Sequence, residues 1–194
     1  MNAPVLDAAV EVLTALRELS HQACLIDGVA LQRWGQPRLT TDVDVSVLAP
    51  FGAEDSIIKD LVGRFQPRVD NAEQFAADRR VLLIKASNGV SIDVALAAFP
   101  FEIEALERAT PWTPSGTPAL VTCSAEDLVL YKLVAARGRD LADMESIVRR
   151  QGSRLDVDRI RRWGREFADL KEDPDLLRPF EDALRKARAS APRT

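Results

Sequence analysis

The sequence of 194 residues has few of the residues that carry several common active-site chemistries. It contains one histidine, His21, and two cysteines, Cys24 and Cys123, which lie in separate apolar runs without zinc-ligand spacing. Histidine-based catalysis, a structural zinc site and a disulfide framework are therefore not expected. Both cysteines are predicted to be reduced core residues.

Long hydrophobic runs are also absent, since no apolar stretch approaches the roughly 18 residues of a membrane span. The first residues lack the basic start and cleavage site of a signal peptide. We therefore expect no membrane association and a cytoplasmic location. The glycine fingerprints of Walker and dinucleotide-binding loops are missing as well.

Charge is unevenly distributed along the chain. Residues 1–131 contain 10 basic and 18 acidic residues, whereas residues 132–194 contain 16 basic and 12 acidic ones, which gives -8 and +4 and a net charge of -4. The basic part could face a phosphate-rich partner, although a solvated helical surface gives the same count. With a pI of about 5.2, the chain does not resemble a DNA-coating protein.

Hydrophobic periodicity predicts an α/β N-terminal half and a helical C-terminal half. A composition shift near Ser124 places the boundary between residues 1–123 and 124–194. Helices are expected over residues 5–19, 29–34, 54–65, 101–109, 125–138, 140–150, 157–170 and 175–189. Strands are expected over residues 23–26, 42–48, 80–86 and 90–97, with an edge strand over 119–123. The stretch 66–78 is expected to be a loop, and Ser124 with Asp127 is typical of a helix N-cap.

The strand that begins at Asp42 alternates strictly between polar and apolar residues, so Asp42 and Asp44 share one face about 6–7 Å apart. Two carboxylates so placed repel each other, and a divalent cation bound by oxygen ligands, Mg²⁺ or Mn²⁺, would keep both ionised. A solvated strand face is the alternative for an isolated Asp-x-Asp pair.

A third acid, Asp93, lies on a later strand whose apolar residues alternate with Ser91, Asp93 and Ala95. Asn88-Gly89 precedes this strand and favours a type I′ hairpin turn, because both central positions of that turn need positive φ. Asp93 thus has small or polar neighbours on its face, as Asp42 and Asp44 do.

Together, these motifs resemble the minimal nucleotidyltransferases of the DNA polymerase β superfamily, and most closely the AbiEii-type and MenT-like toxins of toxin–antitoxin systems. The likeness spans residues 25–147. It is carried by a glycine turn, an Arg-x-Thr-x-Asp-x-Asp motif, a later strand aspartate, and a lysine followed by Arg-Asp-x-x-Asp. In this sequence the residues are Gly28, Arg38, Thr40, Asp42, Asp44, Asp93, Lys132, Arg139, Asp140 and Asp143.

The resemblance implies a nucleotidyltransferase fold, in which a small, twisted mixed sheet is backed by helices. It implies transfer of a nucleoside monophosphate from an NTP to an acceptor. By family analogy the expected acceptor is RNA, in particular tRNA, and a cognate antitoxin is a further expected partner. Asp42, Asp44 and Asp93 would hold Mg²⁺ or Mn²⁺. Gly28, Arg38, Thr40, Lys132, Arg139, Asp140 and Asp143 would form the nucleotide site, and Lys132 would reach the phosphates.

One residue departs from the family pattern, because Asp27 stands where Gly-Gly or Gly-Ser is usual before the helix. An anionic side chain beside a triphosphate is unfavourable unless it points away or joins the metal shell. A degenerate, non-catalytic module that binds a nucleotide or a protein therefore stays open, as does a nucleotidyltransferase that modifies a small molecule such as an antibiotic.

The residues of the second half also have plain structural interpretations. Lys132 lies among leucines, where a lysine commonly packs its stem and extends its head to solvent. Arg139, Asp140 and Asp143 could form a surface cluster on one helix face.

Overall fold

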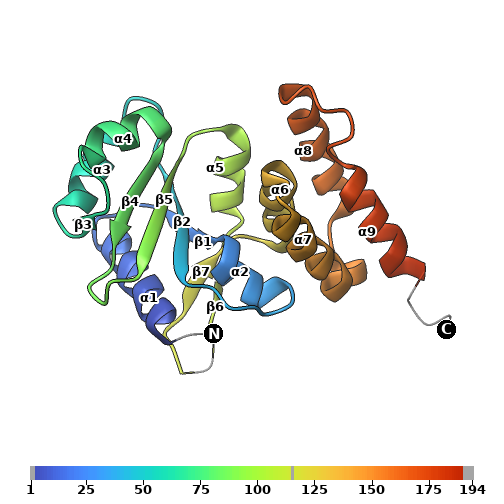
Figure 1. Ribbon diagram of the computed structural model, residues 1–194, viewed down its shortest axis with the longest axis horizontal. Coiled ribbons are helices and arrows are strands. Elements are labelled where there is room, and N and C mark those ends of the chain that lie inside the picture. Colours follow the sequence, from blue (N-terminus) through green and yellow to red (C-terminus); the bar gives the residue numbers. More distant parts are fainter. Residues whose placement is uncertain (1–2, 115, 190–194) are drawn as a thin grey trace. The chain divides into compact units, whose positions relative to one another are not determined.

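One mixed sheet of seven strands is the largest element of the computed structural model, which describes residues 3–114 and 116–189 (Figure 1). The strands are β1 (Ala23–Ile26), β2 (Asp42–Leu48), β3 (Gln66–Pro67), β4 (Val81–Lys85), β5 (Ser91–Ala97), β6 (Thr110–Trp112) and β7 (Leu120–Thr122). Their order across the sheet is β3-β4-β5-β2-β1-β7-β6. β2 is parallel to β5 and β1 is parallel to β7, while the other four pairs are antiparallel. The predicted mixed sheet backed by helices is confirmed.

Three helices cover one face of this sheet: α1 (Ala3–Glu18), α3 (Glu54–Val62) and α4 (Ala72–Arg79). The valines of β2 and the aliphatic residues of β5 that alternate with the aspartates all pack into this core, each at most 2% exposed. Each such side chain contributes about 1.5–3 kcal/mol when it is fully buried. A slip of one residue in either strand would carry aspartates into the core, so burial of this face fixes the register.

The opposite face of the sheet carries the aspartates and is only partly covered. Helix α5 (Pro100–Glu107) packs against β2 and buries Phe101, Ala105 and Leu106. Its first turn begins at a proline, and the Glu102 side chain accepts hydrogen bonds from the backbone N–H groups of Ala98 and Phe99, at 2.8 and 3.0 Å.

The chain divides into two compact units. Among the described residues, the first comprises residues 3–30, 38–114 and 116–123, and the second comprises residues 31–37 and 124–189. Helix α2 (Asp27–Trp34) thus begins in the first unit, and its last residues are grouped with the second. The other elements of the second unit are α6 (Ala125–Ala135), α7 (Gly138–Gln151), a 3₁₀ turn (Gly152–Arg154), α8 (Val157–Leu170) and α9 (Arg178–Ala189).

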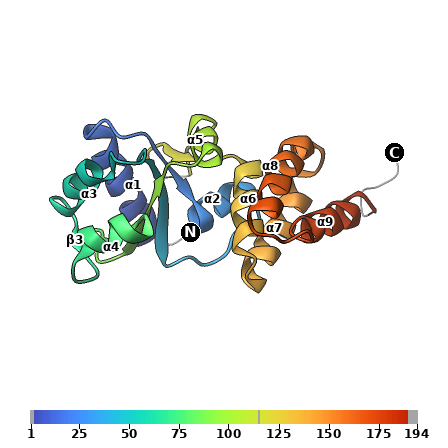
Figure 2. The same ribbon diagram turned by 90° about the horizontal axis from the view of Figure 1, so that it is seen from above.

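Within the helical unit, α6 packs against both α7 and α8, and α7 packs against α9 (Figure 2). The predicted N-cap is confirmed, because the Ser124 hydroxyl accepts a hydrogen bond from the Asp127 backbone N–H at 3.1 Å. The Arg159 guanidinium donates to the buried Asp127 carboxylate at 2.8 and 3.0 Å. This charge-assisted fork joins α8 to the first turn of α6.

The predicted type I′ hairpin is wrong. Gly89 has a positive φ of 82°, but Asn88 does not. The Gly89 N–H bonds to the Ala86 carbonyl and the Ala86 N–H to the Val90 carbonyl, both at 2.9 Å, so three residues form the loop. A turn through Ser87 and Asn88, closed by a left-handed glycine, has the geometry of a three-residue hairpin. The Asn88 amide also donates to the Pro4 carbonyl on α1, which favours this longer loop.

Two further expectations about the sheet need correction. The strand within 119–123 is not at the edge, because β6, which was not expected, pairs outside it. Residues 66–78 were expected to be a loop, but they contain β3 and all of α4 except its last residue. Both missed strands are two or three residues long, too short to show alternation.

The expectation about the cysteines agrees with the structure, since Cys24 and Cys123 are buried thiols. Within residues 3–114 and 116–189, no helix is both long and apolar enough to cross a membrane.

Candidate functional site

The register of the two central parallel strands brings two of the predicted aspartates side by side. Asp44 of β2 pairs directly with Asp93 of β5, and Asp42 pairs with Ser91. Residues opposite each other in a sheet lie on the same face about 4.8 Å apart, so all three aspartates share the face that is not packed in the core. Asp44 and Asp93 are half-buried and Asp42 is exposed.

A threonine holds the first of these aspartates. The Thr40 hydroxyl donates to the Asp42 carboxylate at 3.1 Å, and Thr40 itself is buried. A Cβ added to Gly28 would lie 2.4 Å from the Thr40 hydroxyl oxygen and 3.0 Å from its Cβ. Gly28 is therefore required for Thr40 to approach the turn. The glycine turn, the threonine and the first aspartate form one contact chain within the first unit.

The unusual Asp27 has a specific partner. The Arg38 guanidinium lies 3.5 Å from the Asp27 carboxylate, and both side chains are about three-quarters buried, with 24% and 29% exposure. Asp27 has a φ of 45°, in the left-handed region that Asp tolerates better than most residues. Arg38 thus offsets the negative charge of Asp27, the residue that departs from the family pattern.

Asp93 has a partner that was not expected from the sequence. The Arg68 guanidinium forms a hydrogen-bonded ion pair with the Asp93 carboxylate. Arg68 follows β3 in the aperiodic stretch 66–78, so no pattern singled it out. The one feature that could have indicated a strand here is the polar Arg68 between the apolar Pro67 and Val69. An alternation of three residues is too short to be distinguished from chance.

Lys132 is almost fully buried, with 2% exposure, and its ammonium lies 3.0 Å from Asp140 and 3.1 Å from Asp143. The Arg137 guanidinium also contacts Asp140, at 2.6 Å. The interpretation of Lys132 as a lysine whose head extends to solvent is wrong, as is the surface cluster for Asp140 and Asp143. Two cations thus face two buried carboxylates in this cluster.

Burial alone raises the pKa of Asp140, but the hydrogen bonds from Arg137 and Lys132 outweigh it and hold the pKa of this carboxyl below its ordinary value of 3.8. Arg139 is exposed on the first turn of α7. The structure therefore gathers Lys132, Asp140 and Asp143 as predicted by spacing. Their contact with a nucleotide stays a prediction.

The three aspartates on the sheet face carry the type of ligand atom that binds a divalent metal ion. Three carboxylates from two neighbouring strands supply only oxygen ligands, which Mg²⁺ and Mn²⁺ prefer. The backbone that presents them is fixed by the core on the other face. Asp42 and Asp93 also have neutralising or hydrogen-bonding partners in Thr40 and Arg68.

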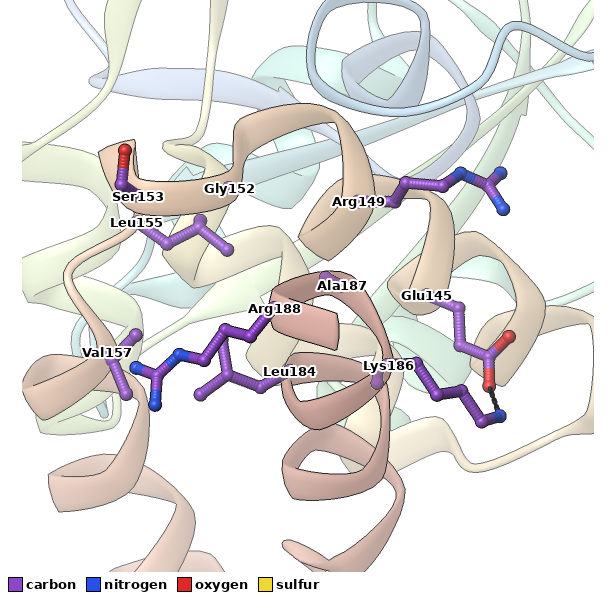
Figure 3. Close-up of a pocket in the computed structure, with 11 residues that line it drawn as sticks. Glu145, Arg149, Gly152, Ser153, Leu155, Val157, Leu184, Lys186, Ala187 and Arg188 are labelled. Atoms are coloured by element: carbon purple, nitrogen blue, oxygen red, sulfur yellow. Dashed lines mark hydrogen bonds and ion pairs between the residues drawn. The ribbon is translucent and has the colours of Figure 1, made fainter. Parts of the chain in front are cut away.

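A separate cavity of about 820 Å³ lies within the helical unit (Figure 3). Apolar residues such as Leu155, Val157 and Leu184 line its inside, and Arg149, Lys186 and Arg188 bring positive charge to its walls. The single acid of the lining, Glu145, is paired with Lys186 at 3.1 Å. No predicted site residue lines this cavity.

Comparisons with known proteins identify the fold. No family model and no curated protein matches the chain. The solution structure of the antibiotic-resistance factor ANT(2″)-Ia aligns with a TM-score of 0.55 and 17% identity, over 89% of this chain and 97% of that one. A crystal structure of ANT(2″)-Ia in complex with adenylyl-2″-tobramycin gives 0.52 and 15%, over 86% and 98%. An antigenic nucleotidyltransferase-like protein from Paracoccidioides brasiliensis gives 0.48 and 16%, over 76% and 77%. The chain has the nucleotidyltransferase fold.

Replacing Gly28 with alanine should destabilise the first unit. The new Cβ would displace Thr40 and break its hydrogen bond to Asp42. Overpacking of this kind costs about 1–3 kcal/mol, which urea unfolding measures. Gly138→Ala is the matched control, because nothing lies within 4 Å of its Cβ position, and it should be neutral or slightly stabilising. Equal effects of the two substitutions would contradict the close approach of Gly28 and Thr40.

Replacing Lys132 with methionine should destabilise the protein strongly, because Asp140 and Asp143 would keep their burial and lose a shared cation. Removing one partner of a buried ion pair costs about 3–5 kcal/mol in the free energy of unfolding. Lys186→Met removes a lysine from an exposed pair with Glu145 and should cost less than about 1 kcal/mol. Small, similar losses in urea unfolding of both variants would show that the Lys132 cluster is not a stabilising unit.

Proposed function

We propose that the chain is a metal-dependent nucleotidyltransferase that transfers a nucleoside monophosphate from an NTP to an acceptor hydroxyl. The observation that carries the proposal is the register of β2 and β5, which places Asp44 beside Asp93 and Asp42 on the same face. The nucleotidyltransferase fold supports it. The alternative, a solvated strand face, accounts for the Asp42 and Asp44 pair but gives no reason for a third aspartate beside them on β5.

In the proposed reaction, the acceptor oxygen attacks the α-phosphorus of the NTP. The bond between the α-phosphorus and its bridging oxygen breaks, and pyrophosphate leaves with the electron pair. Asp93 would orient the acceptor hydroxyl and take its proton on a carboxylate oxygen. Asp42 and Asp44 would hold Mg²⁺ or Mn²⁺ with it. When bound, the metal neutralises charge on the attacking and leaving oxygens.

The remaining predicted residues receive roles around the phosphates. Gly28 allows Thr40 to lie against the turn, and Thr40 fixes the Asp42 carboxylate. Arg38 keeps Asp27 neutralised, so the turn does not present an unbalanced negative charge. Lys132, Arg139, Asp140 and Asp143 remain the proposed second part of the nucleotide site. Lys132 would contact a phosphate only by exchanging a carboxylate partner.

For the acceptor we propose RNA, with tRNA first, and a toxin-like role of the AbiEii type within a toxin–antitoxin pair. The helical unit supports an anionic acceptor, because the cavity of Figure 3 presents Arg149 and Arg188, and its one acid, Glu145, is paired with Lys186. Phosphates would be attracted to this lining. Growth arrest on expression, relieved by a neighbouring gene product, would be expected of such a toxin.

Antibiotic adenylylation is the second candidate, and the similarity to ANT(2″)-Ia favours it. An aminoglycoside such as tobramycin is a polycation and needs carboxylates for recognition, which the acidic sheet face could supply. The cationic cavity would repel it. A non-catalytic module that binds a nucleotide or a protein would keep the same fold with no pyrophosphate release.

Incubation with labelled NTPs, Mg²⁺ and total RNA should transfer label to RNA and release pyrophosphate. Asp42→Asn and Asp44→Asn should each lower the rate by at least about 100-fold, since each removes a proposed metal ligand. Asp55→Asn, an exposed acid on α3, should leave the rate unchanged.

A parallel incubation contains tobramycin. Transfer of label to tobramycin and not to RNA would identify the antibiotic candidate. Nucleotide binding without pyrophosphate release would identify the non-catalytic module. Equal rates in wild type and both aspartate variants would contradict the enzyme proposal.

Substitution of the cavity cations should weaken RNA binding in a salt-dependent manner. Arg149→Gln with Arg188→Gln should reduce the slope of log affinity against log salt by about 0.7–0.9 for each lost phosphate contact. Fluorescence anisotropy of labelled tRNA at several KCl concentrations measures the slope. Arg178→Gln, at the start of the same helix α9 and outside the cavity lining, is the control. An unchanged slope in the double variant would remove the cavity from the RNA surface.

A further inference from the structure

Arg68 is brought to the acidic face by the order of the strands. Its backbone N–H bonds to the Leu83 carbonyl at 2.9 Å, and Leu83 of β4 is the direct register partner of Asp93 on β5. Arg68, Leu83 and Asp93 therefore lie in a line across the sheet, and the two side chains together span two strand spacings, about 9.5 Å. The ion pair is built by the fold and not by sequence proximity.

Two basic residues, Arg68 and Lys85, flank the aspartates from the β4 side, and Arg68 forms an ion pair with Asp93. Lys85 of β4 pairs with Ser91, which in turn pairs with Asp42, so Lys85 lies on the same face. Lys85 is exposed, whereas Arg68 is half-buried with 24% of its side chain accessible and bonds directly to Asp93. Arg68 thus occupies one of the two carboxylate oxygens of Asp93.

We infer that Arg68 is a positioning residue that competes with the divalent cation for Asp93 and thereby sets the metal affinity of the site. This inference rests on the proposed function. Without the cation, the Arg68 guanidinium holds Asp93 and offsets part of the repulsion between Asp93 and Asp44. Binding of a cation at Asp93 would weaken this ion pair, because both positive groups draw on the charge of the same carboxylate.

The competition predicts that removing the guanidinium strengthens metal binding. In Arg68→Met, the affinity for Mn²⁺ should rise by about threefold to tenfold, because the cation no longer displaces an ion pair and no longer meets a nearby positive charge. A residue that only supported the fold would give the opposite result, since its loss would disorder Asp93 and weaken binding.

The experiment is titration calorimetry of the full chain with MnCl₂ and no nucleotide. Arg68→Met is compared with Lys85→Met, which removes a charge from the same face and should change the affinity by less than about twofold. Arg68→Lys keeps a charge without the planar guanidinium and should give an intermediate affinity, and it replaces the methionine variant if that one fails to fold. The proposal predicts tighter binding in the order Arg68→Met, Arg68→Lys, wild type.

Asp44→Asn separates failure of this inference from failure of the proposed function. If Asp44→Asn weakens Mn²⁺ binding more than about tenfold while Arg68→Met leaves it unchanged or weaker, the metal site stands and the competition is overturned. Equal gains in Arg68→Met and Lys85→Met would also overturn it, because a general charge effect would explain both. If wild type binds no Mn²⁺, or Asp44→Asn has no effect, the proposed metal site fails, and the inference fails with it.

Discussion

Mutual repulsion between carboxylates on neighbouring strands is the constraint on which the proposed site depends. Asp44 and Asp93 stand opposite each other because the apolar residues on the reverse face of β2 and β5 must be buried together. The core thus fixes a juxtaposition that is unfavourable by itself. Positive charge has to be supplied around it, and Arg68 supplies one part from within the first unit.

Acidic residues of the two units differ in their exposure to solvent and in their pairing with basic residues. On the sheet face the aspartates remain partly accessible, so an external cation can reach them. In the helical unit, Asp127, Asp140 and Asp143 are buried and matched by Arg159, Arg137 and Lys132, which makes these pairs part of the packing between helices. Accessible acids can bind an external cation directly, whereas the buried ion pairs also hold helices of this unit together.

Much of the fold could be predicted because alternation and helical periodicity report burial directly. β1 and α8 were expected at their observed residues, and the Ser124 cap was recognised from its side chain. The pairing of β2 with β5 could not be derived, since the register of strands separated by two helices depends on packing of the whole core. The hairpin at Asn88 was misassigned because its contact with Pro4 is tertiary. Arg68 escaped notice for the same reason, because only the strand order brings it to Asp93.

The central claim is that Asp42, Asp44 and Asp93 bind a divalent cation together with a nucleoside triphosphate. Anomalous diffraction from crystals soaked with Mn²⁺ and a non-hydrolysable NTP analogue tests it most directly. The account predicts an anomalous peak about 2.1 Å from carboxylate oxygens of Asp44 and at least one of the other two, with phosphate oxygens completing the shell. A bound nucleotide whose Mn²⁺ lies on other residues, with Arg68 still paired to Asp93, would contradict it.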